Sequence, residues 1–372
     1  MHLPNRHTWR ILLVPLSWIY GTAVWVRNLL YDTGVLKATE YNMPVISVGN
    51  LAVGGTGKTP HVEYLVALLK EKFRVATLSR GYRRKTRDFR VASIESTAAE
   101  IGDEPLQIKR RFPAITVAVD RSRRNGIRQL MKLSPPIEVI LLDDAYQHRA
   151  VRPGLSILLM DYSLPVDRDR LLPAGRLREP AGNRNRADIL LVTRSPERVR
   201  PIERREVVKR LGLSIRQHLY FTSVRYGALL PVFEGAPERE ASWYKENVGS
   251  VLIVTGIAQP RPVRQFARSI STRIREINYP DHHRYTARDL DRIIDTYTTL
   301  KGEGQEILVL TTEKDATRLR ELSPPDPFRS ACYAVRIHIH FLNDDEQEFN
   351  KQIHNYVVSN KRSSILYQRE DQ

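Results

Sequence analysis

The sequence has very little cysteine and no long uninterrupted apolar run, and these absences exclude several classes of protein. Its 372 residues include one cysteine, Cys332, so neither an intrachain disulfide nor a cysteine-based metal site is expected. This composition fits a reducing compartment. There is no internal repeat and no low-complexity tract, and 41% of the residues are hydrophobic, enough for a large core. Length and composition therefore predict a globular protein of two domains rather than one.

Positive charge is what the sequence has in excess. Lys and Arg total 59 against 42 Asp and Glu, which gives a formal net charge of +17. Such a surface attracts anions: nucleic acid, acidic lipid head groups or phosphorylated substrates. No helicase motif series and no aromatic-basic binding motif accompanies the charge, so we do not expect a nucleic-acid partner. A basic surface that only aids solubility is the alternative.

The N-terminal stretch Ile11–Val26 is apolar and has basic residues on both sides. It is shorter than the roughly 20 residues that span a bilayer, and Pro15 and Gly21 interrupt it. Its tryptophans favour the membrane–water interface. We therefore expect residues 1–30 to contain a helix that lies in the surface of one leaflet. A helix buried in the protein core is the alternative.

A glycine-rich loop follows the first predicted strand, Pro44–Val48. The helix expected after the loop, over Pro60–Lys72, has apolar residues at helical spacing and a proline in its first turn. Glycines let backbone N–H groups approach phosphate oxygens, and the helix N-terminus adds partial positive charge. Strand, loop and helix together predict a P-loop that binds a nucleoside triphosphate.

The polar side chains of this loop have distinct expected roles. Lys58 is expected to reach the β- and γ-phosphates, and the Thr59 hydroxyl to ligate Mg²⁺. The usual pattern has glycine at the position of Ala52, a departure that later glycines in the loop compensate. The predicted nucleotide-binding residues of this segment are Ala52, Val53, Gly54, Gly55, Thr56, Gly57, Lys58 and Thr59.

Another apolar strand, Val139–Leu142, ends in the carboxylates Asp143 and Asp144. This is a Walker B pattern, in which a buried strand delivers acids to the edge of a sheet beside the phosphates. Both are candidate Mg²⁺ ligands, and the pattern does not say which one contacts the metal. Gln147 and His148 follow closely and are further candidates for the nucleotide site. A solvated turn after the strand is the alternative.

Two polar segments are candidates for acid–base chemistry. Asp103 and Glu104 open a predicted helix, where acids are favourable for electrostatic reasons alone. The functional alternative is a carboxylate base that accepts a proton from an attacking hydroxyl. Pro280–His283 places two histidines beside Asp281, and a histidine near a carboxylate can orient or tune a base. No matching Cys/His spacing supports a metal site there.

Basic residues follow several predicted strands. Arg80 and Tyr82 follow one strand, Arg121 follows the next, and Arg176 lies in a later basic loop. Ligands bind at the carboxyl ends of strands in open α/β sheets, where arginines can clamp phosphates. A solvated basic face is the alternative for each segment.

The alternation of strands with helices predicts a P-loop NTPase-like α/β fold: a twisted, mostly parallel sheet with helices on both faces. We expect a P-loop kinase core over residues 31–152 and a smaller α/β domain over residues 153–332 that closes over the nucleotide. Residues 333–372 are a candidate segment for returning to the core. Further expected strands are Arg74–Leu78, Ile115–Val119, Ser156–Met160, Ile189–Val192, Val251–Val254 and Ile307–Leu310.

An ordered series of motifs across most of the chain resembles the tetraacyldisaccharide 4′-kinase family. Each motif alone is modest, but the ordered set is highly specific. The motifs are SVGNLAVGGTGKTP (Ser47–Pro60), SRGYRR (Ser79–Arg84), GDEP (Gly102–Pro105), LLDDAYQH (Leu141–His148), LLPAGRLREP (Leu171–Pro180), RADILLVTR (Arg186–Arg194), TGIAQP (Thr255–Pro260), YPDHH (Tyr279–His283) and LTTEKDATRL (Leu310–Leu319).

The resemblance implies ATP-dependent transfer of a γ-phosphate to the 4′-hydroxyl of a tetraacyldisaccharide 1-phosphate, which forms lipid IVA in lipid A biosynthesis. It implies ATP and Mg²⁺ as cofactors and an acylated disaccharide lipid as substrate, with no obligate protein partner. It also implies a peripheral or monotopic enzyme on the cytoplasmic face of the bacterial inner membrane. The alternative is a membrane-associated P-loop ATPase switch that acts on a protein partner.

The resemblance further implies roles for individual residues. Asp103 matches the family's catalytic base and His282 its partner in an Asp–His dyad, with His283 as the alternative histidine. Arg176 matches a phosphate-binding arginine. Ala145-Tyr146 stands where many members have Gly-Phe, a conservative departure beside the Mg²⁺ acids. Candidate substrate-binding residues are Asn50, Arg80, Tyr82, Glu104 and Arg121.

Overall fold

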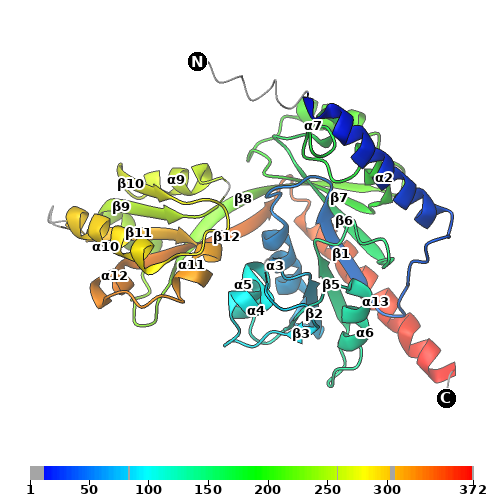
Figure 1. Ribbon diagram of the computed structural model, residues 1–372, viewed down its shortest axis with the longest axis horizontal. Coiled ribbons are helices and arrows are strands. Elements are labelled where there is room, and N and C mark those ends of the chain that lie inside the picture. Colours follow the sequence, from blue (N-terminus) through cyan, green and yellow to red (C-terminus); the bar gives the residue numbers. More distant parts are fainter. Residues whose placement is uncertain (1–11, 83, 258, 302–305, 371–372) are drawn as a thin grey trace. The chain divides into compact units, whose positions relative to one another are not determined.

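The structure, a computed structural model, describes residues 12–82, 84–257, 259–301 and 306–370 (Figure 1). The chain divides into two compact units. Unit 1 comprises Met1–Glu95, Ile108–Val224 and Ile339–Gln372, and unit 2 comprises Ser96–Gln107 and Arg225–His338. Strands β8 and β12 and helix α5 have residues in both units.

Unit 1 contains a sheet with the strand order β8-β7-β6-β1-β5-β2-β4-β3. All neighbouring pairs are parallel except β3 with β4. Its strands are β1 (Val45–Asn50), β2 (Val75–Ser79), β3 (Arg90–Val91), β4 (Thr116–Val119), β5 (Val139–Asp143), β6 (Leu155–Asp161), β7 (Ile189–Thr193) and β8 (His218–Pro231). Every residue of β1, β5, β6 and β7 is buried, as expected for parallel strands covered on both faces.

Helices cover this sheet through separate apolar clusters. Ile127 and Leu130 of α6 pack with the side chains of β2 and β5, and Val207 and Leu211 of α7 pack with β6 and β7. Helix α3, which follows the phosphate loop, contacts β1 and β5. The α-helices with residues in unit 1 are α2 (Val14–Asp32), α3 (Lys58–Leu69), α5 (Asp103–Arg111), α6 (Arg123–Leu130), α7 (Pro201–Leu211) and α13 (Glu346–Glu370).

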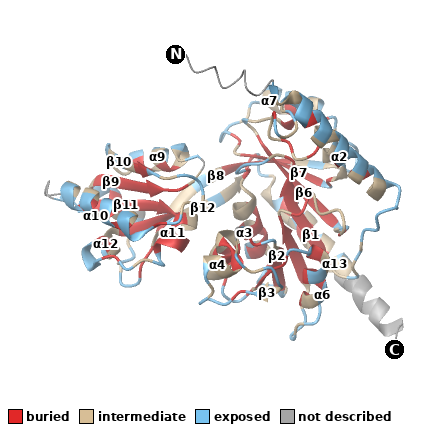
Figure 2. Cartoon of the chain, viewed as in Figure 1, coloured by how far each residue is buried: buried red, intermediate tan, exposed pale blue. Residues whose placement is uncertain are grey.

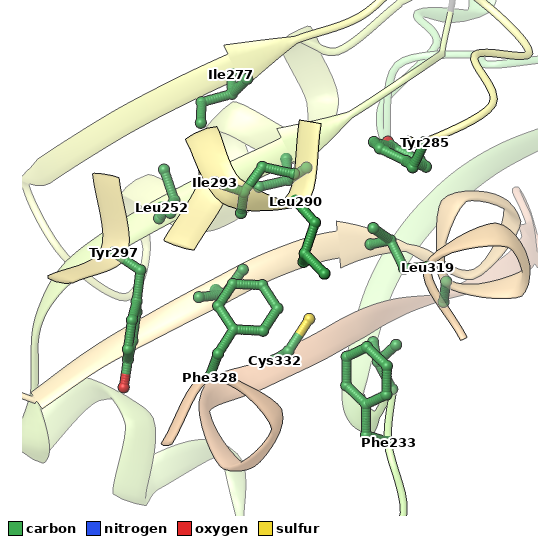
Figure 3. Packing of buried hydrophobic residues seen from close by; sticks show 14 of the residues in the cluster. Phe233, Leu252, Ile277, Tyr285, Leu290, Ile293, Tyr297, Leu319, Phe328 and Cys332 are labelled. Carbon is green, nitrogen blue, oxygen red and sulfur yellow. The ribbon is translucent and has the colours of Figure 1, made fainter. Parts of the chain in front are cut away.

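Unit 2 has a smaller parallel sheet in the order β10-β9-β11-β12. One face carries a core in which Phe328 and Tyr297 pack beside the buried Cys332 (Figure 3). The elements of unit 2 are β9 (Val248–Thr255), β10 (Arg273–Asn278), β11 (Glu306–Thr312), β12 (Cys332–Phe341), α4 (Ala98–Ile101), α8 (Ala241–Asn247), α9 (Arg261–Arg268), α10 (Ala287–Lys301), α11 (Glu313–Leu319) and α12 (Asp326–Ala331).

The observed division of the chain differs from the boundary expected near residue 153. Strands β6 and β7 lie beyond that boundary, yet β6 pairs with β1 and β7 pairs with β6 in the sheet of unit 1. The segment Ser96–Gln107, which contains the GDEP motif, was expected in the core at 31–152 but belongs to unit 2. The C-terminal part, Ile339–Gln372, belongs to unit 1.

Helix α2 runs from Val14 to Asp32, with a proline in its first turn. Residues 1–11, the first part of the expected interfacial segment, lie outside the residues that the structure describes. Within the described ranges, the structure contains no helix with the length and apolar character required to span a bilayer. Polar side chains Ser17 and Asn28 are buried on α2, whereas Trp18 and Trp25 are exposed by 71% and 58%. The helix carries both buried and exposed residues (Figure 2), and it turns Ser17 and Asn28 inward and the two tryptophans outward.

Candidate active site

Two hydrogen bonds hold the phosphate loop at Thr56. The side chain of Asn50, the last residue of β1, donates to Thr56 Oγ1 at 2.8 Å, and Thr193 Oγ1 donates to the Thr56 carbonyl at 2.9 Å. Gly57 precedes α3 with φ +84°, a left-handed conformation in which any side chain would be strained. Gly54 and Gly55 are exposed, so the backbone just before Thr56 is open to a ligand.

The loop lysine lies beside the carboxylate expected from the Walker B pattern. Lys58 Nζ is 3.7 Å from Asp144 Oδ1. Asp144 also accepts from both terminal nitrogens of Arg178, at 2.9 and 3.2 Å, and Arg178 Nη2 donates to Asn50 Oδ1 as well. Burial would raise the pKa of Asp144, but the positive charges of Lys58 and Arg178 hold this pKa below its ordinary value. The site thus combines two cations around one ionised carboxylate.

The neighbouring acid, Asp143, ends β5 and is buried. It pairs in register with Val48 of β1, so the two strand ends that carry the acids and the phosphate loop lie side by side. The described residues contain no cluster of three or more His, Cys, Asp or Glu able to hold a metal alone. Mg²⁺ does not require one, because it retains waters and binds through one or two protein oxygens together with phosphates. The hard oxygen donors of Thr59, Asp143 and Asp144 fit a Mg²⁺ ion that arrives with a nucleotide.

A second segment runs antiparallel to the phosphate loop. The Val53 N–H donates to the Arg176 carbonyl and the Arg178 N–H to the Leu51 carbonyl, both at 2.7 Å. Leu177, between the two arginines, forms an antiparallel bridge with Ala52. The Arg176 side chain donates to Asp169 Oδ2 at 2.8 Å. The structure therefore places Arg176 beside the loop, and it adds Arg178, to which we assigned no role from the sequence.

The residues that follow β5 also contact the loop. Gln147 Nε2 donates to the Asn50 carbonyl at 2.8 Å. Burial and the nearby charges of Arg123 and Arg80 lower the pKa of His148 to about 4, so His148 is neutral at neutral pH. Of the candidate substrate residues in unit 1, Arg80, Tyr82 and Arg121 are exposed and follow the carboxyl ends of β2 and β4.

The acid–base candidates meet within unit 2. Asp103 Oδ2 lies 3.1 Å from His282 Nδ1, and Arg318 Nη2 donates to the same oxygen at 2.5 Å. Burial raises the pKa of Asp103, but the hydrogen bonds from His282 and Arg318 outweigh it and hold this pKa well below its usual range. Glu104, the remaining substrate candidate, lies 3.9 Å from Lys314 Nζ.

The two adjacent histidines have different partners. His283 Nε2 lies 3.0 Å from Asp289 Oδ2, and its ring stacks on Tyr279 with centroids 4.4 Å apart. His282 has φ +61°, and its N–H donates to the Gly256 carbonyl at 3.2 Å. This turn directs His282, rather than His283, to Asp103.

Three cations near the phosphate loop and the Asp103–His282 pair were not predicted from the sequence: Arg178, Lys314 and Arg318. Arg178 follows Arg176 by two residues, the spacing of side chains on one face of an extended segment, and this spacing was the available signal. Lys314 and Arg318 belong to a quoted motif, but no local pattern indicates that they contact Asp103 and His282. Only the fold brings Arg318 and Asp103 together.

A phosphate loop at the carboxyl edge of a mostly parallel sheet, with a strand-end acid beside the loop lysine, defines the class of P-loop NTPase-like phosphotransferases. Within that class, the chain belongs to the LpxK family, tetraacyldisaccharide-1-P 4′-kinase, whose model matches residues 9–358. The family resemblance expected from the sequence is thus confirmed, and the chain is a kinase.

Similar proteins match over nearly their whole length. The tetraacyldisaccharide 4′-kinase of Bacteroides thetaiotaomicron is 46% identical, with 100% of this chain and 98% of the relative covered. That of Porphyromonas gingivalis strain W83 is 42% identical, with 94% and 97% covered. The crystal structure of LpxK from Aquifex aeolicus in complex with ATP is similar with a TM-score of 0.72 and 30% identity, covering 94% of this chain and 99% of that one.

Proposed function

We propose that this chain transfers the γ-phosphate of ATP to the 4′-hydroxyl of a tetraacyldisaccharide 1-phosphate and thereby forms lipid IVA in lipid A biosynthesis. The observation that carries this proposal is the Asp103–His282 contact, at 3.1 Å, in a chain that also has a P-loop. A switch ATPase needs only a positioned water, whereas a carboxylate–imidazole pair suits the removal of a proton from an alcohol. Family membership names the alcohol.

The residues of unit 1 bind and polarise the nucleotide in this proposal. The backbone N–H groups at Gly54–Gly57 and the Lys58 ammonium receive the β- and γ-phosphates. Thr59 and Asp143 or Asp144 would hold a Mg²⁺ ion, which would offset charge on the phosphate oxygens. Arg176 and Arg178 add positive charge beside the same loop. Positioning and electrostatic stabilisation carry most of the rate in this class of reaction.

The residues of unit 2 handle the proton. The acceptor oxygen forms a bond to the γ-phosphorus as the bond from phosphorus to the β-phosphate oxygen breaks, and ADP leaves. Asp103 accepts the proton that the hydroxyl loses, and His282 holds the carboxylate in place. The proposed contacts with the substrate remain Glu104, Arg80, Tyr82, Arg121 and Asn50.

We also propose that α2 attaches the enzyme to the surface of the inner membrane, on its cytoplasmic face. A helix with an apolar outer face and basic neighbours lies in the interface plane and binds through apolar burial. The exposed apolar residues in this part of the chain are Leu12, Leu16, Trp18, Ile19, Trp25, Val26 and Leu29. A contiguous apolar face of this kind marks an interaction surface, and an acylated substrate resides in a bilayer.

The test is a transfer assay with ATP, Mg²⁺, detergent and radiolabelled disaccharide 1-phosphate, resolved by thin-layer chromatography. We expect label to move to a bisphosphorylated product. Asp103→Asn should abolish transfer while ATP still binds, and Asp291→Asn, at an exposed carboxylate of α10, should leave transfer unchanged. ATP turnover without acceptor phosphorylation would support the switch ATPase instead, and near-normal transfer by Asp103→Asn would remove Asp103 as the base.

A further inference from the structure

Helix α11 presents two cations to the proposed dyad. Its N-cap Thr312 accepts from the Asp315 N–H through Oγ1 at 3.1 Å, which fixes where the helix begins. Lys314 and Arg318 are four residues apart and therefore lie on the same face of α11. Lys314 Nζ lies 2.9 Å from His282 Nε2, and Arg318 Nη2 lies 3.3 Å from His282 Nδ1. The imidazole is thus placed between an ammonium and a guanidinium.

Arg318 is anchored on the side away from the dyad. Its side chain is 4% exposed, and its Nη1 donates to the His283 carbonyl at 3.2 Å and to Asp315 Oδ1 at 3.4 Å. Asp315 is itself fully buried and accepts from the Gly256 N–H at 3.1 Å and from Thr312 Oγ1 at 2.8 Å. The buried guanidinium binds Asp315 through Nη1 and Asp103 through Nη2. The contact with Asp315 restricts its movement and so directs Nη2 to Asp103. Arg318 therefore presents Nη2 to Asp103 in a fixed orientation.

Arg318 and His282 both contact the same oxygen of Asp103. Arg318 Nη2 donates to Oδ2 at 2.5 Å, and His282 Nδ1 lies 3.1 Å from it. Oδ1 is then the oxygen available to an incoming hydroxyl. Hydrogen bonds from these partners keep the pKa of Asp103 well below its usual range, so the carboxylate is ionised at neutral pH. Such a weak base accepts the hydroxyl proton only as the new bond to phosphorus forms.

Lys314 determines which nitrogen of His282 carries the proton. An ammonium is a donor only, so Nε2 at 2.9 Å must accept, and the ring proton must be on Nδ1. That proton then points to Asp103 Oδ2. Asp281 and Glu104, with oxygens 3.5 and 3.9 Å from Lys314 Nζ, hold the ammonium in place. Among the residues that the structure describes, the charged groups facing His282 include Asp103, Arg318, Lys314 and Asp281, the last with Oδ2 4.0 Å from Nε2.

We propose that Lys314 and Arg318 are positioning residues of the kinase reaction: Lys314 directs the ring proton of His282 to Nδ1, and Arg318 fixes Asp103 with Oδ1 free to accept a proton. The catalytic part of this inference rests on the proposed function, since it takes Asp103 as the base. The tautomer of His282 does not depend on that function.

The decisive measurement is long-range ¹H–¹⁵N NMR of the full chain labelled at histidine ring nitrogens, with His282→Gln used to assign the signal. In the parent protein at pH 7 we expect a protonated Nδ1 and an unprotonated Nε2 for His282. Lys314→Met keeps the aliphatic stem but removes the ammonium, so Nε2 should gain proton occupancy. Lys314→Arg should restore the parent spectrum, and Lys245→Met, at an exposed lysine of α8, should leave it unchanged. A protonated Nε2 in the parent, or no change in Lys314→Met, would overturn the proposal.

Kinetics supply the second measurement. Lys314→Met should lower kcat about tenfold with the KM for ATP unchanged, because the nucleotide residues are in unit 1. Arg318→Lys should lower kcat as well, because a single ammonium cannot bridge Asp103 and Asp315. If His282 has the expected tautomer but the parent protein transfers no phosphate, the proposed function fails and the tautomer assignment stands. If transfer is normal and neither variant changes kcat, the positioning roles fail.

Discussion

The Arg178 guanidinium donates two hydrogen bonds to the Asp144 carboxylate, at 2.9 and 3.2 Å. Asp144 has φ +48°, in the left-handed region, which directs the residue away from the line of β5. The same carboxylate lies 3.7 Å from Lys58 Nζ. Arg178 therefore shares Asp144 with the loop lysine and limits how tightly Asp144 holds that lysine.

Removing this guanidinium should weaken nucleotide binding. In Arg178→Met, Asp144 has Lys58 as its remaining close cation and should draw it away from the phosphates. Hydrogen bonds to charged groups contribute about 1.5–3 kcal/mol, so the Kd for a non-hydrolysable ATP analogue should rise at least tenfold by isothermal titration calorimetry. Arg168→Met, at an exposed arginine, is the matched control. An unchanged Kd in Arg178→Met would contradict this account.

Ser17→Ala should destabilise unit 1. The Ser17 hydroxyl donates to the Leu171 carbonyl at 3.0 Å and accepts from the Ala174 N–H at 3.0 Å, and the residue is buried. A buried N–H left without its acceptor costs about 1–3 kcal/mol, so urea unfolding should show a loss of about 2 kcal/mol. Thr22→Ala, on the exposed side of α2, should change stability by less than about 0.5 kcal/mol. Equal losses in both variants would show that the contact with residues 171–174 is unimportant.

Replacing the exposed tryptophans of α2 should detach the protein from vesicles without unfolding it. Trp18 and Trp25 are exposed by 71% and 58%, so Trp18→Ser with Trp25→Ser removes outward apolar surface and leaves the inward contacts intact. Co-sedimentation with vesicles containing anionic lipid should fall sharply, while the thermal midpoint stays within a few degrees. Trp243→Ser, in α8 of unit 2, controls for the loss of an indole in general. Undiminished sedimentation of the double variant would exclude α2 as the attachment site.

His61 should make stability fall as the solution becomes acidic. The buried ring contacts the Gly57 carbonyl through Nδ1 at 2.7 Å and Thr222 Oγ1 through Nε2 at 3.0 Å. Burial lowers its pKa from 6.5 to about 4, so the unfolded chain binds a proton first as the pH falls. This group is fully stabilising above pH 6.5 and loses about 2 kcal/mol by pH 5 and about 3 kcal/mol by pH 4.

Comparison with His61→Gln isolates this contribution, because all other titrating groups are common to both proteins. Urea unfolding at pH 7.5 and pH 5 should show a stability difference between parent and variant that shrinks by about 2 kcal/mol at the lower pH. A difference independent of pH would show that folding does not lower the pKa of His61.

Strands buried on both faces were predictable because they appear as short apolar runs. The segments expected at Ser156–Met160 and Ile189–Val192 correspond to β6 (Leu155–Asp161) and β7 (Ile189–Thr193), and the mostly parallel fold with helices on both faces is confirmed. Strand β10, RIREIN, escaped prediction because it is a partly exposed edge strand without an apolar run. Strand β8 was not predicted either: residues 220–223 are buried, whereas His218 is exposed and most of the later residues are partly or fully exposed.

The proximity of Lys58 and Asp144 could also be predicted from the sequence. Each follows the end of a predicted strand, and β1 and β5 proved to be parallel neighbours in register. The contact of Arg318 with Asp103 was not, because the two residues are separated by 215 positions in the sequence. The same limit explains the unit boundary, since the pairing of β6 with β1 is a property of the sheet and not of any local pattern.

Trp18 lies on the outer side of helix α2. The preceding residue, Ser17, donates a hydrogen bond to Leu171, in the loop that continues to Arg178. Once the outer side is adsorbed, the protein no longer searches a volume for its substrate. It diffuses in a thin layer with molecules confined to the same plane, and their effective concentration rises accordingly. Every encounter then starts from the same tilt and the same side of the protein. Under the proposed attachment, the sugar head group of an acylated substrate would be presented to the phosphate loop at a fixed height, while its acyl chains stay in the bilayer.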